Sequence, residues 1–348
     1  MTSDPSASET TTGSGPGATV PATQRLGPDA AGIAEAARLL RAGGLVAFPT
    51  ETVYGLGVDA GDPAAVAALY AAKGRPRFNP LIAHLPDLAA ARCEGVFGGD
   101  AERLAAAFWP GPLTLVVPVA PDGRVCDLAR AGLDTVALRV PAGALARDLL
   151  LRTGRPVAAP SANRSGRVSP TEAAHVLGDL DGRIAAVLDG GPCPVGIEST
   201  IVACLAPGAP VLLRPGGLAR EAIEAVLGRP LGAAPQGAAD APAAPGLLSS
   251  HYAPRAAIRL GAETIRPGEA ALLFGGAAPP GLDGAAARLD LSPSGRLAEA
   301  AANLYAGLRR LDASGAAVIA VVPLPTHGLG EAILDRLRRA AAPRPAEP

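Results

Sequence analysis

The chain has 348 residues, almost half of them hydrophobic, which is enough for two domains with buried cores. Its formal net charge is −1, and no segment contains enough clustered Lys and Arg to form a binding surface for a phosphate backbone. We therefore expect no tight, direct binding of nucleic acid. Among 31 Lys and Arg residues Lys73 is the only lysine, which suggests a task that the planar fork of arginine cannot perform.

Residues 1–27 are rich in Ser, Thr, Gly and Pro over most of their length and predict a disordered N-terminal tail without the apolar core of a signal peptide. No run of 18 apolar residues follows, so we expect no membrane span. The four cysteines form no C-x-x-C pair and have no histidine cluster beside them. This pattern favours neither zinc nor a disulfide framework, and it indicates a reducing, cytoplasmic location.

Residues 28–231 read as an α/β domain, the expected catalytic domain. A helix at 33–40 stops at two glycines, a buried strand follows at 45–50, and the glycines of 51–60 predict a loop that approaches a ligand. The next helix, 62–74, has Asp62 as N-cap, Pro63 in its first turn and Gly74 as its stop. Later strands are expected at 113–119, 135–141, 156–162, 185–191 and 199–204, and helices at 100–108, 143–151 and 171–177.

Residues 232–256 are dominated by Ala, Pro and Gly and predict a linker. A smaller α/β domain is expected over residues 257–342, with strands at 269–276 and 316–325 and helices at 296–311 and 329–341. Residues 343–348 should form a frayed tail. We find no internal repeat.

Polar clusters in the first domain fall at strand ends and in glycine-bearing loops, where α/β folds usually place their sites. Their cations are Lys73, Arg75, Arg139 and Arg214. Their neutral hydrogen-bonding groups include Ser161, Asn163, Ser169 and Ser199. Such a set suits phosphate and carboxylate groups, although no P-loop motif and no G-x-S-x-G nucleophile elbow is present.

Each residue also has a plainer interpretation when it is taken alone. Lys73 could complement the dipole of a helix's last turn, and Arg139 could be an edge residue with its head in solvent. His84 could be an ordinary core histidine, and the segment 161–166 could be a simple turn, since Ser, Asn and Gly favour turns. The individual motifs leave these alternatives open.

Taken together and in order, eight stretches resemble the YrdC-like family, in the long two-domain form of the threonylcarbamoyl-AMP synthases. They are "FPTETVYGLG", "KGRPRFNPLIAH", "FWPGPLTLV", "TVALRVP", "APSANRSGRVSPT", "GIESTIV", "LLRPGG" and "SSHYAP". The resemblance spans residues 48–254. It implies a YrdC-like α/β domain with a twisted mixed sheet, followed by a smaller, Rossmann-like α/β domain.

The family resemblance further implies an enzyme, a nucleotidyltransferase that converts L-threonine, bicarbonate and ATP with Mg²⁺ into L-threonylcarbamoyl-adenylate and pyrophosphate. A separate tRNA threonylcarbamoyl transferase complex would then modify adenosine 37 of tRNA. No zinc and no organic cofactor is implied, and the metal ligands are left unassigned. Covalent catalysis has no candidate residue, since the sequence shows no nucleophile elbow and no evident Cys-His pair.

The same resemblance assigns roles by motif position. Lys73 and Arg75 are the expected catalytic cations. The threonine site comprises Thr52, His84, Arg139, Ala159 and Ser199. The ATP or adenylate site comprises Arg75, Asn79, Thr135, Ser161, Asn163, Ser169 and Arg214. His251 and Tyr252 of the linker would form a lid.

Two other functions compete with this one. A carbamoyltransferase of hydrogenase maturation contains a related domain, but it needs further domains and paired-cysteine zinc motifs that this chain lacks. A non-catalytic RNA-binding module of translation or ribosome maturation is the alternative from another class. The net charge near zero and the 3% of aromatic residues argue against it.

Overall fold

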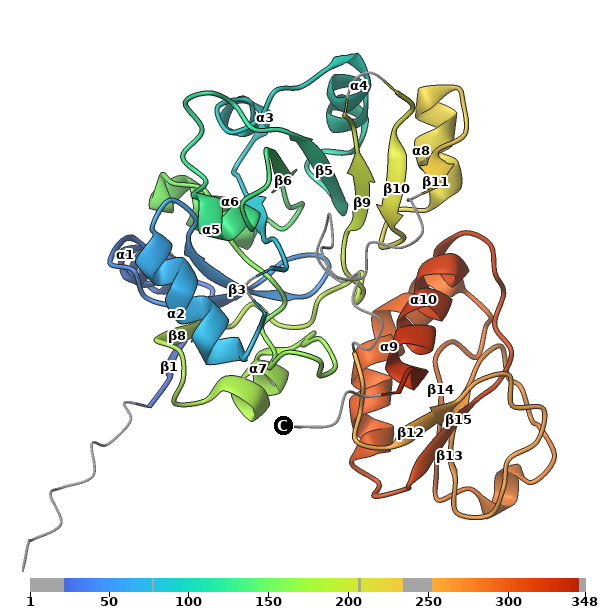
Figure 1. Cartoon of the computed structure of the whole chain (residues 1–348). Coiled ribbons are helices and arrows are strands. Elements are labelled where there is room, and N and C mark those ends of the chain that lie inside the picture. The colour runs from blue at the N-terminus through green and yellow to red at the C-terminus, as the bar shows by residue number, and fades with distance from the viewer. Residues whose placement is uncertain (1–21, 77, 206–207, 234–251, 344–348) are drawn as a thin grey trace, which may run out of the picture.

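Short buried strands of the larger, N-terminal unit build one mixed sheet in the computed structural model, which describes residues 22–76, 78–205, 208–233 and 252–343 (Figure 1). The strands are β1 (Gln24–Leu26), β2 (Val46–Pro49), β3 (Tyr54–Asp59), β4 (Ile82–His84), β5 (Leu113–Pro118), β6 (Thr135–Arg139), β7 (Val157–Ala158), β8 (Ala186–Leu188), β9 (Thr200–Ala203), β10 (Val211–Arg214) and β11 (Gly232–Ala233). Their order in the sheet is β1-β8-β2-β3-β7-β4-β6-β5-β9-β10-β11.

Helices cover parts of both faces of this sheet. They are α1 (Ala30–Arg41), α2 (Pro63–Lys73), α3 (Leu88–Arg92), α4 (Gly99–Phe108), α5 (Asp127–Arg130), α6 (Ala144–Thr153), α7 (Ala173–Leu180) and α8 (Arg220–Leu227). Helices α2, α4, α7 and α8 contribute to the main hydrophobic cluster, whereas α1 and α6 pack with β2 and β8 in another. The mixed sheet and the helices confirm the expected fold class.

Alternation along the strands leaves one face of the central sheet for a site. Val136 and Leu138 of β6 point into the main core, and Ala137 joins a separate cluster with Ile82 and Ile201 on the other face. Because successive side chains of a strand point to opposite faces, Thr135 and Arg139 share the face of Ala137. This second face is therefore where polar groups from several strands converge.

The smaller unit is a separate parallel sheet with two long helices. Its elements are β12 (Ala257–Arg259), β13 (Ala270–Leu273), the short 3-10 helix η1 (Leu282–Gly284), β14 (Ala287–Asp290), α9 (Leu297–Asp312), β15 (Val318–Val321) and α10 (Leu329–Ala341). The strand order is β12-β15-β13-β14, with every pair parallel. Figure 1 shows α9 and α10 on the side of this sheet that faces the larger unit.

Three expectations from the sequence were wrong. Residues 54–59 form strand β3 instead of a loop, because they pair with β2 and β7. Gly57 permits close packing there, since an added Cβ would lie 2.8 Å from the Phe48 side chain and 3.0 Å from that of Val157. Residues 24–26, expected in the tail, pair with β8 as strand β1. Residues 232 and 233, expected in the linker, pair with β10 as β11.

Other boundaries differ by a few residues. The strands expected at 156–162 and 316–325 are shorter, as β7 and β15, and strands β4, β10, β12 and β14 were not predicted. All four cysteines are free thiols. No helix in the described ranges is both long and apolar enough to cross a membrane. The chain outside the described residues includes 1–21, 234–251 and 344–348. The predicted lid residue His251 therefore lies outside the described residues.

Candidate active site

A cavity opens on the second face of the central sheet, at the ends of β4 and β6. Its described lining contains Thr52, Val53, Arg75, Ile82, His84, Arg139, Ala159, Pro160, Ser161, Glu198, Ser199, Arg214 and Tyr252. The cavity thus brings together most of the residues that the motifs predicted. Of the expected set, Lys73, Asn79, Thr135, Asn163 and Ser169 are not in the described lining.

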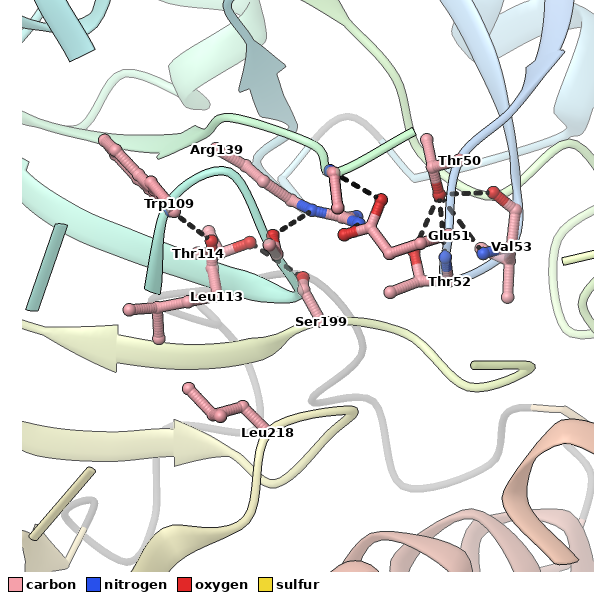
Figure 2. Close-up of polar contacts among 12 residues, drawn as sticks. Thr50, Glu51, Thr52, Val53, Trp109, Leu113, Thr114, Arg139, Ser199 and Leu218 are labelled. Carbon is pink, nitrogen blue, oxygen red and sulfur yellow. Dashed lines mark hydrogen bonds and ion pairs between the residues drawn. The ribbon is translucent and has the colours of Figure 1, made fainter. Parts of the chain in front are cut away.

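Arg139, the last residue of β6, holds its guanidinium at the cavity with help from the "PTET" segment. Its Nη2 donates to Oε1 of Glu51 at 2.6 Å, and Figure 2 shows the guanidinium directed at that carboxylate. The other carboxylate oxygen, Oε2, accepts from the backbone N–H of Ala142 at 3.0 Å. Both side chains of the ion pair are buried, so the arginine is fixed before any ligand arrives. The edge-residue interpretation of Arg139 is therefore wrong.

Ser199 links the strands on the other side of the cavity. Its hydroxyl lies 2.7 Å from the Thr114 hydroxyl (Figure 2), and its carbonyl accepts from Nη2 of Arg214 at 2.9 Å. The backbone at Gly216 packs closely here, because an added Cβ would lie 2.4 Å from the carbonyl carbon of Ser199. Only glycine fits at this position, which explains the "RPGG" sequence after β10.

His84, at the end of β4, is buried and lines the cavity. Its Nδ1 donates to the carbonyl of Ile82 at 3.2 Å, which leaves Nε2 as an acceptor. Burial, with the positive charge of Arg139 as a second cause, lowers the pKa of His84 to about 3. The imidazole is therefore neutral at pH 7. His84 is buried, as an ordinary core histidine would be, but it also lines the cavity.

The depressed pKa of His84 predicts a specific acid sensitivity. Below pH 6.5 the unfolded chain binds a proton at His84 and the folded chain does not, so stability falls as the pH falls towards 3. Between pH 7 and pH 5 this group should remove about 2 kcal/mol from the free energy of unfolding. Urea unfolding of the parent and of His84→Gln at both pH values measures the difference. Equal pH dependence in the two proteins would contradict it.

Lys73 lies behind the cavity wall, at the C-terminal end of α2. Its Nζ donates to the carbonyl of Ser161 at 2.6 Å and also to the carbonyl of Asn163. Burial, reinforced by the charge of Arg75, lowers the pKa of Lys73 well below its usual value. The Lys73 side chain thus holds the segment that carries Ser161 in place through two backbone carbonyls. It is buried and not an exposed side chain at a helix end.

Arg75 and Asn79 follow α2 and are both buried. Arg75 donates to the carbonyl of Pro80 at 3.2 Å, and burial lowers its pKa to about 10, so it remains charged at pH 7. Within the described part of the chain, Nε of Arg75 and both amide atoms of Asn79 have no hydrogen-bond partner. Buried polar atoms rarely lack partners, so these groups mark a place that a polar ligand could complete.

Three other residues that were predicted to bind the nucleotide are not in the described lining of the cavity. Thr135 begins β6, four residues before Arg139 on the same face, which places it about 13 Å along the strand. The Asn163 side-chain amide donates to the carbonyls of Arg164 and Arg167, so it also builds the turn. Ser169 donates its hydroxyl to Glu198 at 2.6 Å.

Two glutamates at the site were missed from the sequence. Glu51 holds Arg139, and Glu198 accepts from Ser169, Tyr305 and Arg336. Burial opposes ionisation of Glu198, but the charges of Arg336 and Arg214 lower its pKa to about 2. Both glutamates stand beside predicted residues in "PTET" and "GIEST". Their partners are far away in the sequence, so no local pattern indicated the ion pairs.

Tyr252 lies in the expected linker and is the first described residue after the gap at 234–251. It is buried, it lines the cavity, and its ring stacks on Tyr305 with the centroids 5.7 Å apart. The backbone φ of Tyr252 is +63°, a conformation that non-glycine residues rarely adopt. The described residues contain no group of three or more His, Cys, Asp or Glu side chains that could hold a metal ion.

Two family models match the chain. The Sua5/YciO/YrdC model, described as telomere recombination, matches residues 38–216. The model described as threonylcarbamoyl-AMP synthase, C-terminal domain, matches residues 218–342. The two matches meet within the short segment between β10 and α8.

Similar proteins cover nearly the whole chain. A threonylcarbamoyl-AMP synthase of Bacillus subtilis (strain 168) is 42% identical over 343 residues, which is 93% of this chain and 97% of the relative. A threonylcarbamoyl-AMP synthase of Pyrococcus abyssi is 42% identical over 89% of this chain and 94% of its own length. The crystal structure of P. abyssi Sua5 complexed with L-threonine has a TM-score of 0.82 and 38% identity, covering 92% of this chain and 97% of that one.

Proposed function

The chain belongs to the threonylcarbamoyl-AMP synthase family, and on that premise we propose that its cavity joins L-threonine, bicarbonate and ATP into L-threonylcarbamoyl-adenylate with release of pyrophosphate. The observation that carries the proposal is the Arg139 guanidinium fixed by Glu51 beside a neutral His84 and the Ser199 hydroxyl. A small zwitterion with a hydroxyl side chain suits this combination of groups.

Threonine would bind at the end of β6. Arg139 pairs with its carboxylate, and Nε2 of His84 accepts a hydrogen bond from its hydroxyl or amine. Thr52, Ala159 and Ser199 close the space around it. The positive charges of Arg139, Arg75 and Arg214 disfavour a protonated amine nearby, so the bound amine is more easily held neutral and nucleophilic.

ATP would lie along the same face of the sheet, from the cavity towards Thr135. Arg75 and Arg214 face the phosphates, and Lys73 supports them from behind Ser161. Asn79, Asn163 and Ser169 supply neutral hydrogen bonds. Mg²⁺ enters as part of the ATP substrate, bound to its phosphate oxygens.

The chemical step needs positioning and charge more than a protein nucleophile. The threonine amine adds to carbon dioxide and loses a proton, or adds to bicarbonate with loss of water, and either route gives a carbamate. A carbamate oxygen then forms a bond to the α-phosphorus as the bond from that phosphorus to pyrophosphate breaks. Fixed cations stabilise the negative charge that grows on the leaving oxygen, a contribution of several kcal/mol in a site that excludes water. Holding the partners in line contributes about 7 kcal/mol or more.

The product is unstable in water, and we propose that the linker covers it. Tyr252 lines the cavity from the end of the linker, which supports a lid made of His251 and Tyr252. The adenylate would pass in the cytoplasm to a separate tRNA threonylcarbamoyl transferase complex. No tRNA groove is required for the first step.

The proposal is tested by pyrophosphate release from ATP with L-threonine and bicarbonate omitted in turn. We expect release to require all three substrates. Release that continues without threonine would contradict the proposed reaction, whereas retention of tRNA at about 0.15 M salt without any turnover would favour the RNA-binding alternative.

Asn79→Leu should separate function from stability. It removes a buried amide that has no partner among the described residues, so the free energy of unfolding should stay unchanged or rise by about 1 kcal/mol. The KM for ATP should rise about tenfold, since a ligand contact is lost. Asn303→Leu is the control, because Asn303 donates to the carbonyl of Leu291 within the smaller unit and is not in the described lining of the cavity. A large loss of stability in Asn79→Leu with an unchanged KM would contradict the assignment.

A further inference from the structure

Helices α9 and α10 of the smaller unit pack against the loops that carry the candidate substrate residues (Figure 1). Val53, Val168 and Ile197 of the larger unit belong to the same hydrophobic cluster as the buried residues of these two helices. Their respective sequence neighbours are Thr52, Ser169 and Glu198. Thr52 and Glu198 line the cavity, and Ser169 donates a hydrogen bond to Glu198. The core of the smaller unit therefore extends to the back of the site.

The contact at α9 is too close for a side chain. Gly196 has a φ of +74°, and an added Cβ would lie 2.4 Å from the Cα of Ala302 and 2.5 Å from its carbonyl oxygen. Real Cβ atoms do not approach backbone so closely, so the loop before Glu198 is fitted directly onto the helix. Movement of α9 would move this loop with it.

Glu198 forms one of the ion pairs that join the two units. Its Oε2 accepts from Nε of Arg336 at 2.8 Å and from the Tyr305 hydroxyl at 2.7 Å, both from the smaller unit. Its Oε1 accepts from the Ser169 hydroxyl at 2.6 Å. One buried carboxylate thus joins α9 and α10 to a predicted nucleotide residue, and Ser199 is the next residue in the chain.

Arg336 reaches a second loop of the site. Its side chain is fully buried, its Nη2 donates to the carbonyl of Pro215 at 3.0 Å, and Pro215 follows Arg214 directly. The centre of its guanidinium also lies 5.1 Å from the centroid of the Tyr252 ring. Arg336 is not in the described lining of the cavity, so it acts on a ligand only through the residues it holds.

We propose that Glu198 and Arg336 form a positioning pair through which the smaller unit holds Ser169, Ser199 and Arg214 in the geometry that binds the nucleotide. The inference rests on the proposed function. It assigns the smaller unit a role in binding the nucleotide. Two charges buried together carry a desolvation cost, which an interface of apolar residues alone would avoid.

The test removes both charges together. Glu198→Gln with Arg336→Met removes both members of the ion pair and nearly keeps the volume. Arg214 keeps its bond to the Ser199 carbonyl and Asp335 keeps its ion pair with Arg339, so the double variant should fold. We expect its KM for ATP to rise about tenfold, or about 1.4 kcal/mol, while kcat changes less than about threefold. Tyr305→Phe, which removes one donor to Glu198, should raise the KM about threefold. Equilibrium binding of ATP by calorimetry should follow the same order without turnover.

The matched control is another ion pair between the units. Nη2 of Arg220 lies 2.5 Å from Oε1 of Glu331, and both side chains are half-buried. Neither residue bonds to Ser169, Ser199 or Arg214. Arg220→Met with Glu331→Gln should therefore leave the KM for ATP unchanged. A Glu198→Gln, Arg336→Met protein whose KM and affinity for ATP match the parent would overturn the positioning pair.

The outcomes for the pair and for the proposed function can be told apart. If the parent shows threonine-dependent release of pyrophosphate but the double variant equals it, the pair alone is wrong. If the parent binds ATP but lacks that reaction, the proposed function is wrong, and calorimetry still decides the pair. If the parent does not bind ATP at all, both are overturned.

Discussion

Arg139→Gln should reduce kcat/KM for threonine about 10³-fold, or about 4 kcal/mol, with less than about a threefold change in the KM for ATP. The substitution removes the charge expected to pair with the threonine carboxylate, and it leaves Glu51 buried without its partner. Initial rates of pyrophosphate release at varied threonine measure the effect. A value within threefold of the parent would contradict the assignment of Arg139.

Two further variants separate binding from folding in this experiment. Glu51→Gln combined with Arg139→Gln removes the unpaired carboxylate, so it should fold better than Arg139→Gln and remain as inactive towards threonine. Arg155→Gln is the matched control, because Arg155 pairs with the buried Asp59 at 2.6 Å outside the cavity lining. It should keep the parent's kcat/KM for threonine.

Lys73→Arg should lose about 100-fold in turnover, or about 2.7 kcal/mol, although it keeps the charge. The Lys73 ammonium fits between the carbonyls of Ser161 and Asn163 in a buried site. A guanidinium is larger and planar, so it would displace the segment that carries Ser161 into the cavity. Steady-state turnover and the thermal midpoint of unfolding should be measured together.

Arg152→Lys, at the exposed last turn of α6, is the control for a basic residue at a helix end. It should leave turnover unchanged. If Lys73→Arg also keeps near-normal turnover, Lys73 has only a helix-dipole role, and the reason for the single lysine would lie outside the site.

The elements with local signals were predictable from the sequence. Helix α2 has Asp62 accepting from the N–H of Ala64, Pro63 in its first turn and Gly74 in the left-handed conformation at its end. Each of these features depends only on neighbouring residues, so the helix was predicted within two residues. The lining residues His84 and Arg139 followed from the family resemblance, although strand β4, which carries His84, was not predicted.

Features that depend on distant residues could not be predicted in this way. Gly57 is typical of a loop when it is taken locally, but it lies in β3, which pairs with β2 and β7. Glycine is needed there because Phe48 and Val157 occupy the space of a side chain. Glu51 meets Arg139, and Glu198 meets Arg336 from the other unit, only after the chain has folded. A carboxylate next to a predicted site residue gives no local sign of which arginine it will hold.

The most direct test of the account is to identify the product by mass spectrometry when ¹³C-bicarbonate replaces ordinary bicarbonate. The parent, given ATP and L-threonine, should form an adenylate that contains threonine and is heavier by one mass unit, in amounts matching the pyrophosphate released. An adenylate without the label, or threonine-independent pyrophosphate with no such product, would contradict the proposed reaction.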